Sequence, residues 1–207
     1  QIENAVQATN IDKTIVSTDD EEFAEAGREY GADVPFIRPS ELATDDVPVI
    51  TVYDHAREYF AERGNEPTYV VGLQPTCPFT TVEQVESAVR KAKTTECDAV
   101  VSVAKVTETH PYRSYTLSDD ILQPFEDVTV REPMQRQERP NIYGLTGAIF
   151  VRHRDVLEQW AGEDFALGDE TRVVEQSQEE AIDIDTPYEL KVARALFSYE
   201  ADAESEP

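Results

Sequence analysis

The chain of 207 residues is poor in residues that mark specialised scaffolds, with two cysteines, eight glycines and one tryptophan. Cys77 and Cys97 are far apart and fit no metal-ligand spacing, which argues against a disulfide framework or a zinc ribbon. We expect both to be reduced thiols, and Cys77 to be a small packing residue. The glycines are scattered, so the sequence contains no glycine-rich loop that could hold phosphates.

Positive charge is also scarce. Eighteen Lys and Arg stand against 43 Asp and Glu, a net charge of −25, and only five of the cations are lysines. A field of this sign repels nucleic acid and anionic membranes, so we expect neither as a partner. The hydrophobic content of 40% and its periodicity argue against disorder. We interpret the acidity as a solvated surface of the halophilic type; the alternative is a polyanionic surface that binds a basic partner.

Long apolar runs are missing as well. No stretch reaches the ~20 apolar residues of a membrane-spanning helix, and no charged-then-apolar leader opens the chain. The length suits one domain with a sizeable core. Together with the reduced thiols, these features predict a cytoplasmic protein.

What the sequence does contain is an alternation of short apolar strands and amphipathic helices. This alternation predicts an α/β fold with a largely parallel sheet. Residues 105–140 interrupt it and contain a possible hairpin around residues 118–120. Phe23, Ala26 and Tyr30 recur at helical spacing. We expect strands at residues 13–16, 33–38, 69–73, 98–103, 147–151 and 181–185, and helices at residues 1–9, 21–30, 49–60, 82–92, 155–160 and 187–197.

The central stretch is residues 69–79, YVVGLQPTCPF. A short β-branched run that ends in prolines predicts a buried strand followed by a stiff loop. Ligands of open parallel sheets bind at the carboxyl ends of the strands. We therefore expect Gln74 and Thr76 to face a binding site.

A second stretch, residues 181–189, reads AIDIDTPYE. Strand alternation would place Asp183 and Asp185 on one face, and residues 186–189 carry the hydroxyl, proline and glutamate of a helix start. Two converging carboxylates suit Mg²⁺, which takes one or two of them in many proteins. An equally open alternative is that one aspartate caps the helix and the other is solvated.

These stretches and the segments between them resemble the acylneuraminate cytidylyltransferases (CMP-sialic acid synthetases) over most of the chain. The matching pieces, in the order of the family, are residues 15–20, 38–46, 73–78, 136–137, 143–151 and 182–186. The resemblance implies a Rossmann-like nucleotide-diphospho-sugar transferase fold, with a mostly parallel sheet, helices on both faces and an insertion at residues 105–140 for dimerisation and sugar binding. The implied reaction joins a nonulosonic acid to CTP and releases pyrophosphate.

The resemblance also implies roles for individual residues. Asp183 and Asp185 match the catalytic pair that binds Mg²⁺ or Mn²⁺, and Arg38 matches an arginine near the cytosine and ribose. Arg136 matches the receptor of the sugar carboxylate on the dimerisation segment of a homodimer, a task for which a bidentate guanidinium is well suited. The implied sugar-binding residues are Gln74, Arg136, Gln137 and Tyr143.

The chain departs from the family in two respects. The family begins with a strand and a glycine-rich loop that hold the triphosphate, so we expect residues 1–207 to be one N-terminally truncated domain that is inactive alone. Gly144 and Thr146 stand where sialic acid enzymes commonly carry Arg and Asn, which predicts another acceptor, such as a legionaminic or pseudaminic acid. The alternatives are a cytidylyltransferase of the octulosonate class, or a non-catalytic remnant that binds nucleotide or a protein partner.

Overall fold

A computed structural model of the chain describes residues 1–107, 110–125, 135–162 and 164–205. Its centre is a four-stranded sheet in the order β1-β5-β2-β6. The strands are β1 (Tyr69–Leu73), β2 (Ala99–Lys105), β5 (Tyr143–His153) and β6 (Thr171–Gln176). Three of them share one direction, and β5 runs antiparallel to its neighbours β1 and β2. The predicted α/β fold is confirmed, with β5 as the reversed strand.

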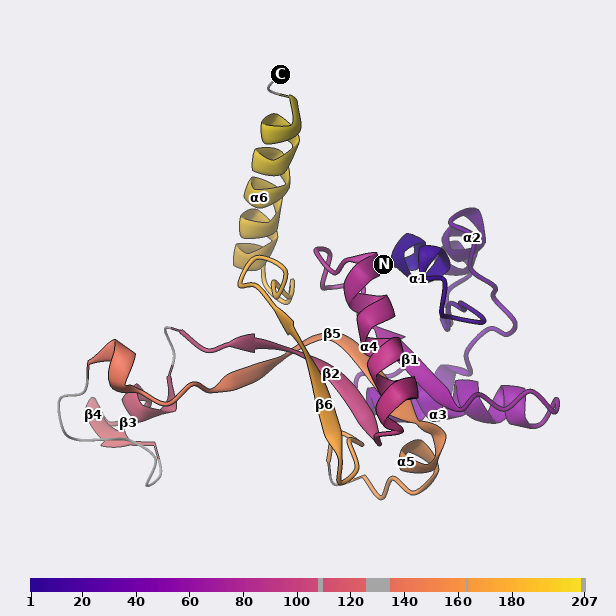
Figure 1. Ribbon diagram of the computed structural model, residues 1–207, viewed down its shortest axis with the longest axis horizontal. Coiled ribbons are helices and arrows are strands. Elements are labelled where there is room, and N and C mark those ends of the chain that lie inside the picture. The colour runs from indigo at the N-terminus through magenta and orange to yellow at the C-terminus, as the bar shows by residue number, and fades with distance from the viewer. Residues whose placement is uncertain (108–109, 126–134, 163, 206–207) are drawn as a thin grey trace.

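Helices cover both faces of the sheet (Figure 1). On one face, Val85 and Ala88 of α4 (Val82–Thr95) pack with Val71 and Ile149 in the main buried cluster. On the other face, α3 (Val49–Ala61) and α5 (Arg154–Glu158) pack around Val70. Val70 and Val71 can serve opposite faces because successive strand residues alternate. Burying each such aliphatic side chain contributes about 1.5–3 kcal/mol.

Short-range signals place the helix starts well. At α4, Thr81 and Gln84 form a reciprocal capping box. At α6 (Pro187–Ser205), the carboxylate of Glu189 accepts from the backbone N–H of Thr186 at 2.6 Å, as the sequence predicts for this helix start. The helix α2 (Glu21–Glu29) is capped by Asp20, whose carboxylate accepts from two backbone N–H groups. Residues 1–9 contain the predicted helix as α1 (Ile2–Gln7).

The two strands expected at residues 13–16 and 33–38 are wrong. The structure has only an isolated parallel bridge between Ile15 and Asp33 there.

Phe23 and Tyr30, which share helical spacing, are 65% and 54% exposed. Periodicity gives these side chains a common face, but only packing decides whether a neighbouring element covers that face.

The strand expected at residues 181–185 is also wrong. The last strand of the sheet is β6, which the sequence does not reveal because most of its side chains are polar. In the structure, Val173 on this strand is 42% exposed. Residues 182–185 are irregular and lead into α6, which projects away from the sheet (Figure 1).

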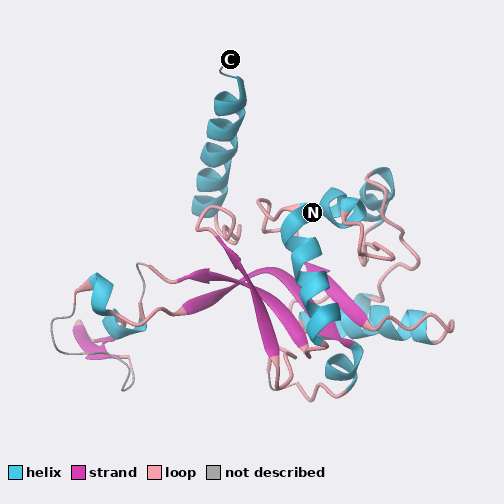
Figure 2. Cartoon of the chain, viewed as in Figure 1, coloured by secondary structure: helices cyan, strands magenta, loops and turns pink. Residues whose placement is uncertain are grey.

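The predicted hairpin is confirmed as β3 (Tyr115–Ser118) and β4 (Ile121–Pro124). Its turn residues Asp119 and Asp120 have φ values of 50° and 61°, as a two-residue turn between right-twisted strands requires. The hairpin lies beyond the extended ends of β2 and β5, on the side of the sheet away from the α-helices α3, α4 and α5 (Figure 2). Short 3₁₀ helices occupy Ser40–Leu42, Pro111–Arg113 and Arg136–Glu138.

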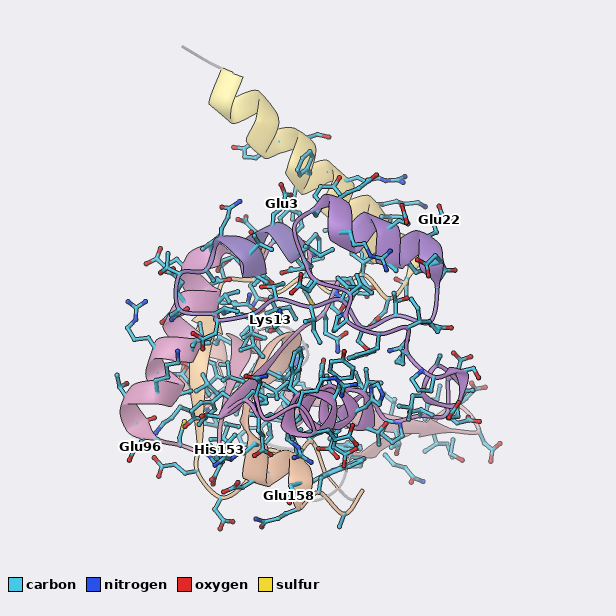
Figure 3. All side chains as sticks on the ribbon, turned by 90° about the vertical axis from the view of Figure 1, so that its right-hand side faces the viewer. Glu3, Lys13, Glu22, Glu96, His153 and Glu158 are labelled. Carbon is cyan, nitrogen blue, oxygen red and sulfur yellow. The ribbon has the colours of Figure 1, made fainter. Side chains whose placement is uncertain are left out.

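Acidic side chains lie on the outside of the molecule. Glu3, Glu22, Glu96 and Glu158 are all exposed and lie around the periphery in Figure 3. Within the described residues, no helix has both the length and the apolar character needed to cross a membrane.

Candidate active site at the carboxyl end of β1

The turn after β1 meets the segment that carries the paired aspartates. The backbone N–H of Ile184 donates a 2.9 Å hydrogen bond to the carbonyl oxygen of Thr76. Gln74 opens the same turn, and its carbonyl oxygen accepts from the N–H of Cys77 at 3.3 Å. The structure therefore brings together the two stretches that the sequence singles out, although they are more than a hundred residues apart.

Asp183 lies against a bulge in β5. The pairing of β5 with β2 shifts between Val101, opposite Phe150, and Val103, opposite Leu145, so residues 146–149 have no partner in β2, although Ile149 still pairs with Leu73 of β1. In this bulge Gly147 has φ +79°, and a Cβ atom there would lie 3.2 Å from Oδ2 of Asp183. Glycine suits the positive φ at this position, and a larger residue would push the carboxylate back by a few tenths of an ångström.

The thiol of Cys77 lies near the carboxylates of both Asp183 and Asp185. Its side chain is fully buried and unpaired, and Sγ lies 3.6 Å from the carbonyl oxygen of Thr146. Burial, the nearby charge of Asp183 and, less strongly, the charge of Asp185 together raise the pKa of the Cys77 thiol to about 12. Asp183 and Asp185 are thus close to the same thiol, which stays neutral at physiological pH as expected for a packing residue.

The chemistry of these groups fits a divalent ion. Oδ1 of Asp183 is buried and has no hydrogen-bond partner among the described residues. A buried carboxylate oxygen without a partner costs free energy that a bound cation would offset. Within the described parts of the chain, no group of three or more His, Cys, Asp or Glu side chains could hold a metal ion. A pair of carboxylates can nevertheless hold Mg²⁺, which often takes one or two protein carboxylates and leaves other positions to water and substrate phosphates.

A cavity of about 620 Å³ is lined in part by Asp183, a size within the range of about 300–1,000 Å³ that is common for small-molecule sites. Lys105 and Gln178 contribute polar groups to its lining, and Phe150 and Phe165 contribute aromatic rings. Lys105 brings positive charge to this wall. The cavity can therefore accept a ligand that is anionic at one part and apolar at another.

A buried arginine supports the aromatic wall of the cavity. Arg152 is 3% exposed and donates to the carbonyl oxygens of Phe165 at 3.0 Å and of Ala166 at 3.1 Å. Its guanidinium also lies 4.3 Å from the centre of the Phe150 ring. Burial lowers the pKa of Arg152 to about 10, so the group remains charged at neutral pH.

The other residues implied by the resemblance have no described contact with the Gln74 turn or with the aspartate segment. Arg38 is held by Asp19 at 3.3 Å, and its contacts in the structure are with residues 18 and 19. Tyr143 begins β5, is 47% exposed, and has its pKa raised by a hydrogen bond to Glu175. Gln137 is exposed in the 3₁₀ helix at Arg136–Glu138, and the side chain of Arg136 lies outside the described residues.

Sequence reasoning missed Gly147 and Lys105. A glycine inside a strand pattern is a signal for a bulge or for close approach of another group, and Gly147 carried that signal. Nothing in the sequence indicated that Lys105 lines a cavity, because a single lysine at the end of a strand is usually solvated. Thr146 is 8% exposed and points to other core side chains, which sequence alone does not show.

Known proteins share both sequence and fold with this chain. A family model described as "Cytidylyltransferase" matches residues 1–159. The CMP-N,N'-diacetyllegionaminic acid synthase of Legionella pneumophila is 30% identical over 203 residues, 96% of this chain and 84% of that protein. The pseudaminic acid cytidylyltransferase of Campylobacter jejuni is 24% identical over 95% of this chain and 82% of its own length.

A solved structure supports the fold. CMP:2-keto-3-deoxy-manno-octonic acid synthetase complexed with CTP superposes with a TM-score of 0.66, at 17% identity, over 96% of this chain and 86% of that one. The 4-diphosphocytidyl-2C-methyl-D-erythritol synthase of Anaerococcus prevotii gives a TM-score of 0.62 at 14% identity, over 95% and 85% of the two chains. The chain belongs to the cytidylyltransferase family and is a CTP-dependent nucleotidyltransferase.

Proposed function

We propose that the protein transfers the cytidylyl group of CTP to a nonulosonic acid and releases pyrophosphate. The observation that carries the proposal is the meeting of the Gln74 turn with the aspartate segment through the Ile184–Thr76 hydrogen bond of 2.9 Å. It places Asp183, one of whose carboxylate oxygens is buried without a hydrogen-bond partner, at the carboxyl end of a strand, beside a cavity with both polar and aromatic walls.

The acceptor class comes from the relatives. Those that match along most of their length are named as synthases or cytidylyltransferases of legionaminic and pseudaminic acids. An N-acylneuraminate cytidylyltransferase of Escherichia coli is 27% identical over 93% of this chain. The octulosonate enzyme is similar in fold at 17% identity, so octulosonate is the second acceptor to test.

We assign Asp183 and Asp185 to a Mg²⁺ or Mn²⁺ ion. When bound, such an ion neutralises charge that builds on the phosphates during transfer. Asp183 contributes its buried, unpartnered oxygen, and Asp185 contributes a second negative charge near the same turn. The two carboxylates would hold the ion close to the turn that carries Gln74.

The remaining roles concern binding and orientation. Gln74 and Tyr143 offer hydrogen-bonding groups to the sugar, together with Gln137 and Arg136. Lys105 adds a cation at the cavity wall that suits an anionic substrate. Arg38 binds the cytosine or ribose end of CTP. Alignment of two anionic substrates lowers the entropic part of the barrier.

We also propose that residues 1–207 act as one domain whose insertion, residues 105–140, forms a homodimer. The hairpin in this insertion exposes Leu117 at 68% and Leu122 at 64%, and a second copy would cover such apolar groups. Two unpaired, buried thiols fit a reducing compartment, so we place the protein in the cytoplasm.

The test is pyrophosphate release from CTP and Mg²⁺ with a panel of legionaminic, pseudaminic, sialic and octulosonic acids, in low and molar KCl. We expect release with at least one nonulosonic acid from a protein that also carries the N-terminal strand and glycine-rich loop of the family. Asp185→Asn should lower kcat by about 10²-fold or more, because it removes negative charge from the ion without changing side-chain volume.

The exposed Asp12→Asn is the matched control, and its kcat should equal that of the wild type. Full activity of both Asp185→Asn and Asp183→Asn would move the metal elsewhere. No release with any acid would favour a remnant that only binds nucleotide or a protein partner.

A further inference from the structure

Three polar side chains lie together inside the sheet. Ser102 on β2, Thr146 on β5 and Gln176 on β6 are 1%, 8% and 6% exposed. A buried hydroxyl or amide costs free energy unless it is hydrogen-bonded. Their bonding partners therefore show what this cluster holds in place.

The donor and the acceptor of each hydrogen bond in this cluster follow from the chemistry of the groups. Thr146 Oγ1 lies 2.6 Å from Gln176 Oε1 and 2.6 Å from Ser102 Oγ. An amide oxygen only accepts, so the single Thr146 proton goes to Gln176, and the Ser102 hydroxyl must donate to Thr146. Ser102 Oγ in turn accepts from the backbone N–H of Ile149 at 2.9 Å. The longer contact from Ser102 to the Ile149 carbonyl, 3.4 Å, is then unused.

At the other end, the cluster reaches the start of α4. Gln176 Nε2 donates to Gln84 Oε1 at 3.1 Å. The same Gln84 oxygen accepts from the backbone N–H of Thr81, within the capping box of the helix. One directed chain of hydrogen bonds thus connects the start of α4 with the β5 bulge. We call Ser102, Thr146 and Gln176 the hydroxyl relay.

The relay holds the bulge on both sides of its glycine. Thr146 precedes Gly147, and the amide of Ile149 follows it two residues later; both are bonded within the relay. Gly147 is the residue against which Asp183 packs, with Oδ2 at 3.2 Å from a Cβ position there.

We propose that the hydroxyl relay is a positioning unit for cytidylyl transfer, which fixes the β5 bulge and thereby the carboxylate of Asp183. The inference rests on the proposed role of Asp183 at the divalent ion. The three side chains act through Asp183 and need not touch the substrates. Residues that orient a metal ligand in this way typically change metal affinity or activity by about 10–100-fold when replaced.

The first test is Thr146→Val, which keeps the side-chain volume and removes the hydroxyl. We expect the Mn²⁺ dissociation constant of the nucleotide-free protein, measured by electron paramagnetic resonance of free Mn²⁺, to rise about 10-fold or more. Hydrogen exchange of the Ile149 amide should accelerate by a similar factor, and KM for CTP should stay within about twofold of the wild type. Thr146→Ser keeps the hydroxyl and should restore Mn²⁺ binding and exchange.

The matched control is Thr94→Val, which removes an exposed hydroxyl of α4 bonded to the carbonyl of Lys91 at 3.2 Å. It should change neither Mn²⁺ binding nor Ile149 exchange. If Thr146→Val does not fold, Ser102→Ala removes the donor to Thr146 and carries the same expectations.

The outcomes separate the two proposals. A folded Thr146→Val protein with wild-type Mn²⁺ affinity overturns the relay, and so does a wild-type protein that binds no Mn²⁺. A wild-type protein that binds Mn²⁺ in a relay-dependent manner but turns over no sugar acid supports the relay and overturns the proposed function.

Discussion

Gly147 and Asp183 approach each other so closely that an added Cβ on the glycine would lie 3.2 Å from Oδ2 of the aspartate. The contact joins a strand of the central sheet to a segment that has no regular structure of its own. It therefore makes the position of the carboxylate depend on the backbone of β5.

This relationship predicts the effect of Gly147→Ala. The left-handed φ of +79° costs a non-glycine residue about 1–2 kcal/mol of stability, and the new methyl group must displace Asp183 by a few tenths of an ångström. We expect kcat to fall about 10-fold or more and the half-saturating Mg²⁺ concentration to rise, as measured by pyrophosphate release.

Gly64→Ala is the control, because Gly64 has φ +73° and no atom within 4 Å of its Cβ position. It should lose similar stability and keep its activity. Equal kinetic effects of the two substitutions would show that strain alone, and not the contact with Asp183, is responsible.

The Cys77 thiol should be unreactive in the folded protein. Burial raises its pKa to about 12, so only about one molecule in 10⁴ carries a thiolate at pH 8. In a Cys97→Ser background, iodoacetamide should label Cys77 slowly in buffer and rapidly in urea, as followed by mass spectrometry. Fast labelling of the native protein would contradict the burial of this side chain.

The same shift has a consequence for stability. The folded pKa lies above the value of about 9 expected for the unfolded chain, so the fold favours the neutral thiol. The stability that this preference contributes is complete below pH 9 and is lost as the pH rises toward 12. The difference in the free energy of unfolding between wild type and Cys77→Ala should therefore shrink between pH 8 and pH 10.5.

The hairpin predicts how the dimer can be broken. Leu117 and Leu122 face each other across β3 and β4 and are 68% and 64% exposed. Leu117→Asp with Leu122→Asp should weaken self-association about 100-fold or more, roughly 2.7 kcal/mol, in sedimentation equilibrium. Phe23→Asp, a substitution at a 65% exposed side chain on α2, should leave the association unchanged. A wild-type protein that is monomeric at all concentrations would refute this prediction.

The acidic surface predicts stabilisation by salt. The net charge of −25 repels itself, and the Debye length falls from about 10 Å at 0.1 M to about 3 Å at 1 M salt. We expect the melting temperature to rise by about 5–10 °C between 0.1 and 2 M KCl, roughly 2–3 kcal/mol for a chain of this size.

The control for this prediction changes the charge itself. The exposed pair Glu3→Lys and Glu96→Lys reduces the repulsion, so the double variant should depend less on salt. A melting temperature that falls with KCl would count against the halophilic interpretation.

Local chemistry determined several elements from the sequence. Thr186, Pro187 and Glu189 start α6, because a capping hydroxyl, a fixed φ and a reciprocal carboxylate act within one turn of backbone. Asp119 and Asp120 form the hairpin turn for the same reason. The sequence also singled out the Gln74 and Asp183 stretches, which the fold brings together, while the roles of these residues stay predictions.

Only the tertiary structure decided the rest. The sequence could not distinguish β6 from residues 181–185, reverse the direction of β5, or show that Phe23 is exposed and Thr146 internal. It also could not place Gly147 against Asp183 or join Ser102 to Gln176. Local signals depend on neighbours within a few residues. Strand partners, bulges and buried polar contacts depend on the free energy of the whole sheet, to which segments far apart in the chain contribute together.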